Sequence, residues 1–231
     1  MSGIVNTPGY YYSIAYILAA FIVTGTNRDR LTGWKRRLVQ MVFSAVLVSY
    51  MWITDGVRQT LFLPAMVVTI AMILFYLYAC DEFTFPEAGY YCARAFISGE
   101  FAASLCWQIF FYTKDRFLSE HVSMWRWGEL VVVYGIIFTV IYLIERGLCK
   151  DGVNVRINRR ELMTVIVITI AVFAVSNMSY LDQNTLFSSP FAGEMFAIRT
   201  LVDLSGMAVL YAYHIQTREP QMKFEVDTLQ N

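Results

Sequence analysis

The chain has 231 residues, of which 57% are hydrophobic and 16% are charged, and its 18 basic and 18 acidic side chains give a formal net charge of zero. Together with a mean hydropathy of +0.49, this composition agrees with a chain that lies in lipid. Charges of opposite sign are spread over the loops and are not gathered into a basic patch, so no nucleic-acid partner is expected.

Seven apolar stretches follow one another, each long enough to cross a hydrocarbon layer of about 30 Å as a helix. In chain order they are residues 9–25, 38–54, 61–80, 88–112, 127–145, 162–180 and 196–215. We therefore predict an all-α fold, a polytopic membrane helical bundle with about seven transmembrane helices. The second stretch is short and the fourth is long and polar, so six spans plus one tilted or re-entrant helix is an alternative.

The basic residues of the loops predict the orientation, because positive charge near the end of a span resists translocation. Of the 18 Lys and Arg residues, twelve fall in the loops at 28–37 and 146–160 or after the last stretch, and four fall in the alternate loops. The N-terminus is therefore expected outside and the C-terminus in the cytoplasm. The first eight residues carry no positive charge, so the first stretch is expected to remain as a span and not to be a cleaved signal.

No motif for catalysis, phosphate binding or metal binding is present in the chain. The cysteines at 80, 92, 106 and 149 have no metal-ligand spacing and are interpreted as small packing residues. His121 and His214 have no Cys or carboxylate at ligand spacing. We expect no catalytic residue, cofactor or metal in this chain.

The fourth stretch carries small residues at alternating steps of four and three, which places them on one helical face. Such a seam lets a neighbouring helix approach closely, and helix packing is favoured over a ligand groove. The seam consists of Ala88, Cys92, Ala95, Gly99, Ala102 and Cys106.

The charged residues inside the predicted spans include Arg94 and Glu100 in the fourth, and Arg199 and Asp203 in the seventh. Charges at this depth cost about 2.5 to 3.5 kcal/mol each on insertion scales, so they should face protein and have partners. From their depths, Arg199 is expected to bridge Asp203 and Glu100. Arg94 is expected to reach the cytoplasmic boundary and an acid at position 81 or 82.

This group of four residues has three interpretations. It can be a polar clasp that fixes helix register, a relay whose pairing shifts when a signal binds outside, or part of a proton or ion path.

The tail after the last stretch contains Pro220, which predicts a local break in the helix. Beyond it Met222, Val226 and Leu229 follow at steps of four and three, the opening of an apolar heptad pattern. We expect residues 1–216 to form a membrane domain and residues 217–231 to begin a cytoplasmic linker or dimerisation helix of a longer protein.

Three stretches carry a resemblance to a known family: residues 94–112 (RAFISGEFAASLCWQIFFY), 176–180 (SNMSY) and 198–216 (IRTLVDLSGMAVLYAYHIQ). In these stretches the chain resembles the N-terminal multi-span sensor regions of bacterial GHKL-type sensor histidine kinases of the Agr-like branch. The other spans match only as hydrophobic helices. A phospho-acceptor histidine segment and a nucleotide-binding domain are not among the residues here.

The resemblance implies a signal-input domain in the bacterial cytoplasmic membrane, coupled through its last span to a cytoplasmic kinase. It also implies an extracellular ligand, for which a peptide is one candidate, a homodimer, and a response regulator reached through the kinase domain. ATP and Mg would be bound only by that missing domain. The chief alternative is a small transporter or ion channel, for which the internal repeats or paired broken helices of transporters are not seen. An intramembrane enzyme and a structural role are further alternatives.

Overall fold

The computed structural model describes residues 7–55, 59–117, 122–148, 157–181 and 192–230, and these form seven α-helices and no named strand. In chain order the helices are α1 (Gly9–Thr26), α2 (Gly33–Ile53), α3 (Gln59–Cys80), α4 (Phe85–Phe117), α5 (Val122–Leu148), α6 (Arg159–Leu181) and α7 (Ala192–Gln230). The predicted all-α class is confirmed, and each predicted stretch coincides with one helix.

Four of the helices contain a segment that is long and apolar enough to cross a membrane. These segments are Leu61–Cys80, Met124–Leu148, Arg159–Asn177 and Glu194–Thr217. Large apolar side chains are exposed along the same helices, among them Val67, Val131 and Val167. A membrane-embedded bundle explains these exposed side chains, because lipid is a suitable solvent for them.

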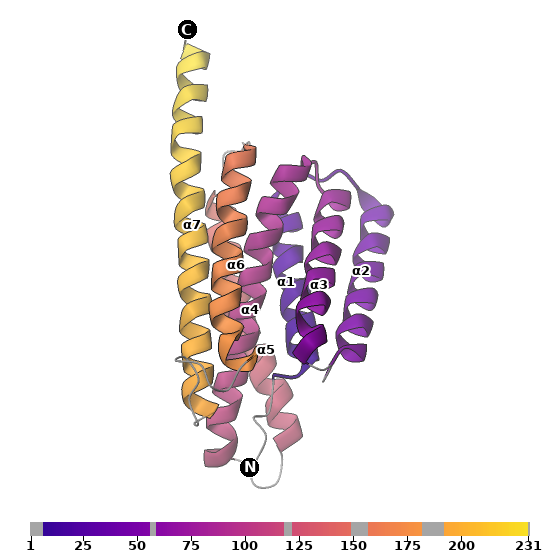
Figure 1. Ribbon diagram of the computed structural model, residues 1–231. Helices are drawn as coiled ribbons and strands as arrows, with labels where there is room; N and C mark the ends of the chain where they lie inside the picture. The colour runs from indigo at the N-terminus through magenta and orange to yellow at the C-terminus, as the bar shows by residue number, and fades with distance from the viewer. Residues whose placement is uncertain (1–6, 56–58, 118–121, 149–156, 182–191, 231) are drawn as a thin grey trace.

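Helix α4 runs through the middle of the bundle and packs against α1, α3, α5, α6 and α7, while α2 lies at the edge against α1 and α3 (Figure 1). The residues of α4 from Tyr90 to Ser104 are all buried. The expectation that Arg94 and Glu100 face protein is therefore confirmed.

The small-residue seam of α4 makes close helix contacts. A Cβ added at Gly99 would lie 2.5 Å from the Tyr16 ring of α1, so only glycine fits against that ring. Cys92 Sγ donates to the Ile70 carbonyl of α3 at 3.4 Å. These contacts support the packing interpretation of the seam, because small residues let neighbouring backbones approach.

Helix α7 continues well past the other helices to Gln230 (Figure 1). The predicted break at Pro220 is therefore wrong. Proline removes only one helical hydrogen bond, the one accepted by the Gln216 carbonyl. Gln216 is exposed, so solvent can satisfy that carbonyl.

Two loops are fastened together at the end of the bundle from which α7 emerges. Asp29 and Asp81 form an isolated antiparallel β-bridge between the α1–α2 and α3–α4 connections. Arg30 Nη1 donates to the Tyr78 carbonyl at 2.9 Å and Nη2 to the Phe83 carbonyl at 3.0 Å. Arg36 forms an ion pair with Asp29 and donates to the Thr24 carbonyl.

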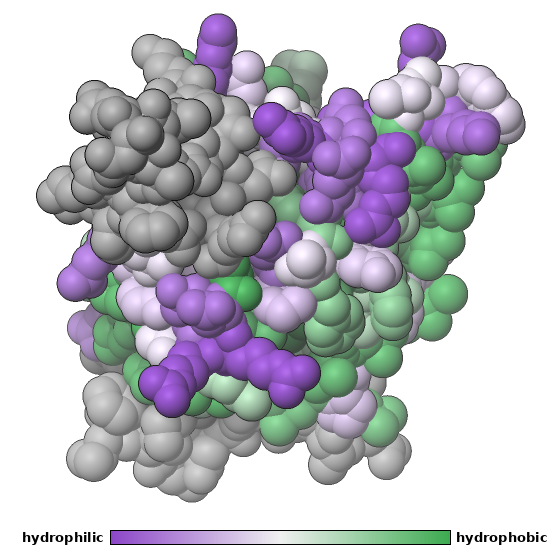
Figure 2. All heavy atoms as spheres, turned by 90° about the horizontal axis from the view of Figure 1, so that it is seen from above, coloured by the Kyte–Doolittle hydropathy of each residue, from purple (hydrophilic) through white to green (hydrophobic). Residues whose placement is uncertain are grey.

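Figure 2 looks onto this end of the bundle and shows hydrophilic residues gathered on it, with hydrophobic residues along the right-hand flank.

Asp81 makes the contact between the α1–α2 and α3–α4 connections sensitive to pH. Its side chain is fully buried and both carboxyl oxygens lack a hydrogen-bond partner. Burial raises the pKa of Asp81 from its ordinary value of 3.8 to about 7, and the Asp29 carboxylate acts in the same direction, against Arg36 and Arg30.

We predict that Asp81→Asn raises the melting temperature at about pH 8 but not at about pH 4. Between about pH 4 and pH 7 the unfolded chain has lost the Asp81 proton while the folded protein retains it, so stability falls as pH rises through this window. Asparagine cannot ionise and removes that loss. Thermal unfolding of the purified protein in detergent at both pH values measures the effect, and an equal gain at both would contradict it.

Candidate functional site

Two buried polar clusters join α4 to its neighbours, and α7 contributes to both. We call them the Glu100 cluster and the Arg94 cluster after their α4 residues. The Glu100 cluster consists of Tyr16, Glu100, Ser104, Asn177, Arg199 and Asp203. The Arg94 cluster consists of Arg94, Glu145 and Tyr211. Along α7, residues 199 and 211 are about 18 Å apart at 1.5 Å per residue. The two clusters therefore hold this helix at two separate depths.

The Glu100 cluster connects four helices. Arg199 Nη2 of α7 donates to Glu100 Oε2 at 3.0 Å and to Asn177 Oδ1 of α6 at 3.0 Å. The Tyr16 hydroxyl of α1 donates to Glu100 Oε1. Arg199 also lies over the Tyr12 ring, 5.5 Å from its centroid. Because Glu100 is only 1% exposed, these contacts replace the water that its charge would otherwise require.

The predicted bridge by Arg199 is half right. The contact between Arg199 and Glu100 is confirmed as an ion pair, whereas Asp203 forms no ion pair with Arg199 in the described structure. Asp203 instead accepts a hydrogen bond from Ser104 Oγ of α4 at 2.9 Å. The Arg199 guanidinium donates to Glu100 and Asn177 instead, so Asp203 takes its hydrogen bond from α4.

The Arg94 cluster lies closer to the N-terminal end of α4 than the Glu100 cluster does. Arg94 Nη2 donates to Glu145 Oε1 of α5 at 2.6 Å, and both side chains are almost fully buried. The Tyr211 hydroxyl of α7 donates to the same Glu145 oxygen at 2.8 Å. The Arg94 guanidinium lies 4.4 Å from the centroid of the Tyr211 ring. This arrangement combines an ion pair with a cation–π contact, both strengthened by exclusion of water.

The expected pairing of Arg94 with Asp81 or Glu82 is therefore wrong. Arg94 is nine residues into α4, which places it about 14 Å below the start of the helix. Glu145, the last residue of the predicted fifth span, lies at that depth.

His214 lies next to the Arg94 cluster, closer to the end of the bundle from which α7 emerges. Its Nδ1 lies 2.9 Å from the Tyr90 hydroxyl of α4, and the residue is 1% exposed. Among the described residues, no group of three His, Cys, Asp or Glu side chains is arranged to hold a metal ion. His121 and Cys149 lie outside the described residues.

The four charged residues were predicted from the sequence, but most of their partners were not. These partners are Tyr16, Ser104, Glu145, Asn177 and Tyr211. Asn177 lies within the SNMSY stretch, and Ser104 is one turn after Glu100, so both had a weak signal. Tyr16 and Glu100 are 84 residues apart, and nothing in the sequence connects them.

Comparisons of the chain with family models, with curated proteins and with solved structures found no match.

We predict that Arg94→Leu and Glu145→Leu each lower the free energy of unfolding by about 3 to 5 kcal/mol, because each leaves a buried charge without its partner. The double variant should cost clearly less than the sum of the two, since no unpaired charge is left. Thermal and denaturant unfolding in detergent provide the double-mutant cycle. Additive losses would show that the two side chains are not coupled.

Proposed function

We propose that this chain is the membrane-embedded input domain of a bacterial two-component sensor histidine kinase of the GHKL type. The observation that supports this proposal most is the construction of α7. The helix is held by Arg199, Asp203 and Tyr211 in two buried clusters and then continues out of the bundle to Gln230. A helix of this kind can carry a change in packing from the bundle to a domain attached beyond its end.

The energies of the α7 contacts suit such a switch. A tenfold change in the ratio of two packings requires about 1.4 kcal/mol of differential binding by a signal. Interhelical polar contacts in membranes are worth about 0.6 to 2 kcal/mol each. Exchange of one contact, such as Ser104 with Asp203, is therefore enough to shift the position of α7 appreciably.

We further propose that all seven helices cross the membrane, with the N-terminus outside. Successive helices are antiparallel, and the α1–α2 and α3–α4 connections lie at the end from which α7 emerges (Figure 1). Helix α4 is one uninterrupted helix of 33 residues, about 50 Å long, which supports a span over a re-entrant segment. The basic residues of the α1–α2 connection favour a cytoplasmic location for that end.

The topology predicts opposite labelling at the two ends of the bundle. In a Cys149→Ser background, Met124→Cys at the outer end of α5 should react with an impermeant maleimide on intact cells. Arg37→Cys at the start of α2 should react only after lysis. Both positions are exposed, and the other cysteines, at 80, 92 and 106, are buried. Reaction of Arg37→Cys on intact cells would overturn the proposed orientation.

The exposed face of α7 favours a second copy of the chain as partner. Exposed residues on this face are spaced by four and three positions in turn, and the apolar positions of the tail continue the same spacing. The exposed positions are Leu201, Ser205, Ala208, Ala212 and Ile215, and the tail positions in phase with them are Met222, Val226 and Leu229. A parallel homodimer through this stripe would place two kinase domains side by side. Those kinase domains would bind ATP and Mg and would contact the response regulator.

The relay interpretation of the Glu100 cluster predicts that Asp203→Asn changes the basal output of a kinase. For this test the chain is fused after Asn231 to a GHKL kinase core, and autophosphorylation is measured in membrane vesicles. Asparagine keeps the size of the side chain but removes the ionisable carboxyl group that faces Ser104, so the two packings of α7 should change in ratio by about tenfold. Thr164→Ala is the control, because Thr164 of α6 is exposed, its hydroxyl donates to the Arg160 carbonyl of its own helix, and it lies outside both clusters and the exposed stripe of α7.

Unchanged autophosphorylation in Asp203→Asn would reduce the cluster to a packing element. A transporter or channel is the second candidate function, favoured by Asp203, a fully buried acid that lies with Ser104 of α4 in the interior of the bundle. Ion-selective flux through the purified protein in liposomes, abolished by Asp203→Asn, would support that candidate over the sensor.

A further inference from the structure

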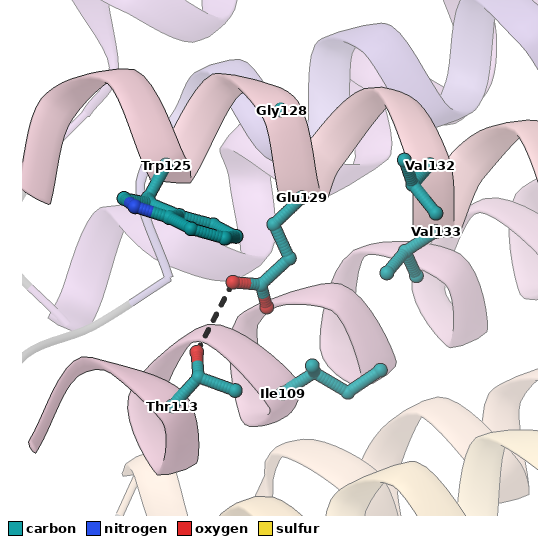
Figure 3. Close-up of a pocket in the computed structure, with 7 residues that line it drawn as sticks. All are labelled: Ile109, Thr113, Trp125, Gly128, Glu129, Val132 and Val133. Atoms are coloured by element: carbon teal, nitrogen blue, oxygen red, sulfur yellow. Dashed lines mark hydrogen bonds between the residues drawn. The ribbon is translucent and has the colours of Figure 1, made fainter. Parts of the chain in front are cut away.

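A cavity of about 540 Å³ lies between α4 and α5, outside both polar clusters. Figure 3 shows its lining residues, which come from the C-terminal part of α4 and the N-terminal part of α5. They are Ile109, Thr113, Trp125, Gly128, Glu129, Val132 and Val133. Volumes of this size are typical of sites for small organic ligands.

One carboxyl group enters this otherwise apolar space. The Glu129 side chain extends from α5 toward α4, and Thr113 Oγ1 donates to Glu129 Oε2 at 3.1 Å (Figure 3). The other oxygen, Oε1, is buried and has no hydrogen-bond partner. An acid in a membrane-spanning segment with one buried oxygen unpaired favours a donor that the chain itself does not provide.

The nearest basic residue on α5 does not serve as that donor. Arg126 is three residues before Glu129 and so lies on a neighbouring part of the helix surface. Its guanidinium instead lies over the Tyr10 ring of α1, 5.5 Å from the ring centroid. No ion pair joins Arg126 to Glu129 in the described part of the chain.

The remaining walls suit a hydrocarbon. Trp125 and Val132 are 58% and 59% exposed on the flank of the bundle, so the cavity opens toward the lipid and not toward the bundle centre. A Cβ added at Gly128 would meet no atom within 4 Å, which shows that the absence of a side chain there keeps the space open.

We propose that this cavity binds an amphiphile that carries a primary ammonium group. The ammonium donates to Glu129 Oε1, and the hydrocarbon body packs along Ile109, Val132 and Trp125. The ammonium provides the missing donor as a charge-assisted hydrogen bond, and the hydrocarbon body is compatible with walls that already face lipid. The site does not depend on the proposed sensor function, because it is defined by direct binding.

The test uses a dodecylamine with a diazirine in its chain and the protein in nanodiscs of phosphatidylcholine, which has no primary amine. Photolabelling should be saturable, should be competed by plain dodecylamine, and should map by peptide mass spectrometry to residues 109–113 and 125–133. The matched diazirine dodecyl methyl ether, which has no hydrogen-bond donor, should label these peptides at least about tenfold less, the loss expected for one charge-assisted hydrogen bond.

Two variants and one control complete the design. Glu129→Gln removes the acceptor charge and Gly128→Leu fills the cavity, so both should lower labelling at least about tenfold. Gly135→Leu makes the same kind of change on the same helix, also in open space, but outside this cavity, and should leave labelling unchanged. If Glu129→Gln fails to fold, Gly128→Leu and its control carry the test.

Equal labelling by the methyl ether, or unchanged labelling in the folded Glu129→Gln or Gly128→Leu protein, would overturn the proposal and leave an ordinary contact with lipid chains. A further arm identifies the source of the amine. Competition by phosphatidylethanolamine in the nanodisc would assign the ligand to the headgroup of a membrane lipid. Labelling that phosphatidylethanolamine does not compete would assign it to a free amphiphile.

Discussion

The structure depends on the pairing of charges inside a bundle that excludes water. Helix α4 carries Arg94 and Glu100 in its most buried part, and neither charge can remain there alone, since an unpaired ion in such surroundings costs several kcal/mol. Each therefore requires a partner from another helix at the same depth. Glu145 and Arg199 meet this requirement from α5 and α7. The ion pairs thus hold α5 and α7 against α4 in one register.

Close packing and polar pairing act together at the same positions. Gly99 lets the Tyr16 ring approach α4, and the hydroxyl of that ring then reaches Glu100, the next residue. On the other side, a Cβ at Gly206 of α7 would lie 2.5 Å from Val172 of α6. Close approach of α6 and α7 is what allows Asn177 and Arg199 to meet. Small residues therefore set the distances over which the polar contacts form.

This arrangement explains why α7 is the natural output of the bundle in the proposed function. Its buried face contributes to both clusters, while its exposed face repeats at heptad spacing toward the tail. A displacement of α7 along or around its axis changes both faces at once. The cavity beside Glu129 lies against the other end of α4, so a ligand there would bear on the helix that holds α7 in place.

The sequence by itself determined the seven helices, the burial of the charged residues of α4 and the pairing of Glu100 with Arg199, because hydrophobic length, helical periodicity and depth are local quantities. It did not determine that Arg94 pairs with Glu145, that Asp203 bonds to Ser104, or that α7 continues through Pro220. Only the tertiary structure decided these points. Which of several polar groups at one depth becomes the partner depends on the rotation of each helix and the direction in which its side chains lean, and these are fixed by packing between segments far apart in the chain.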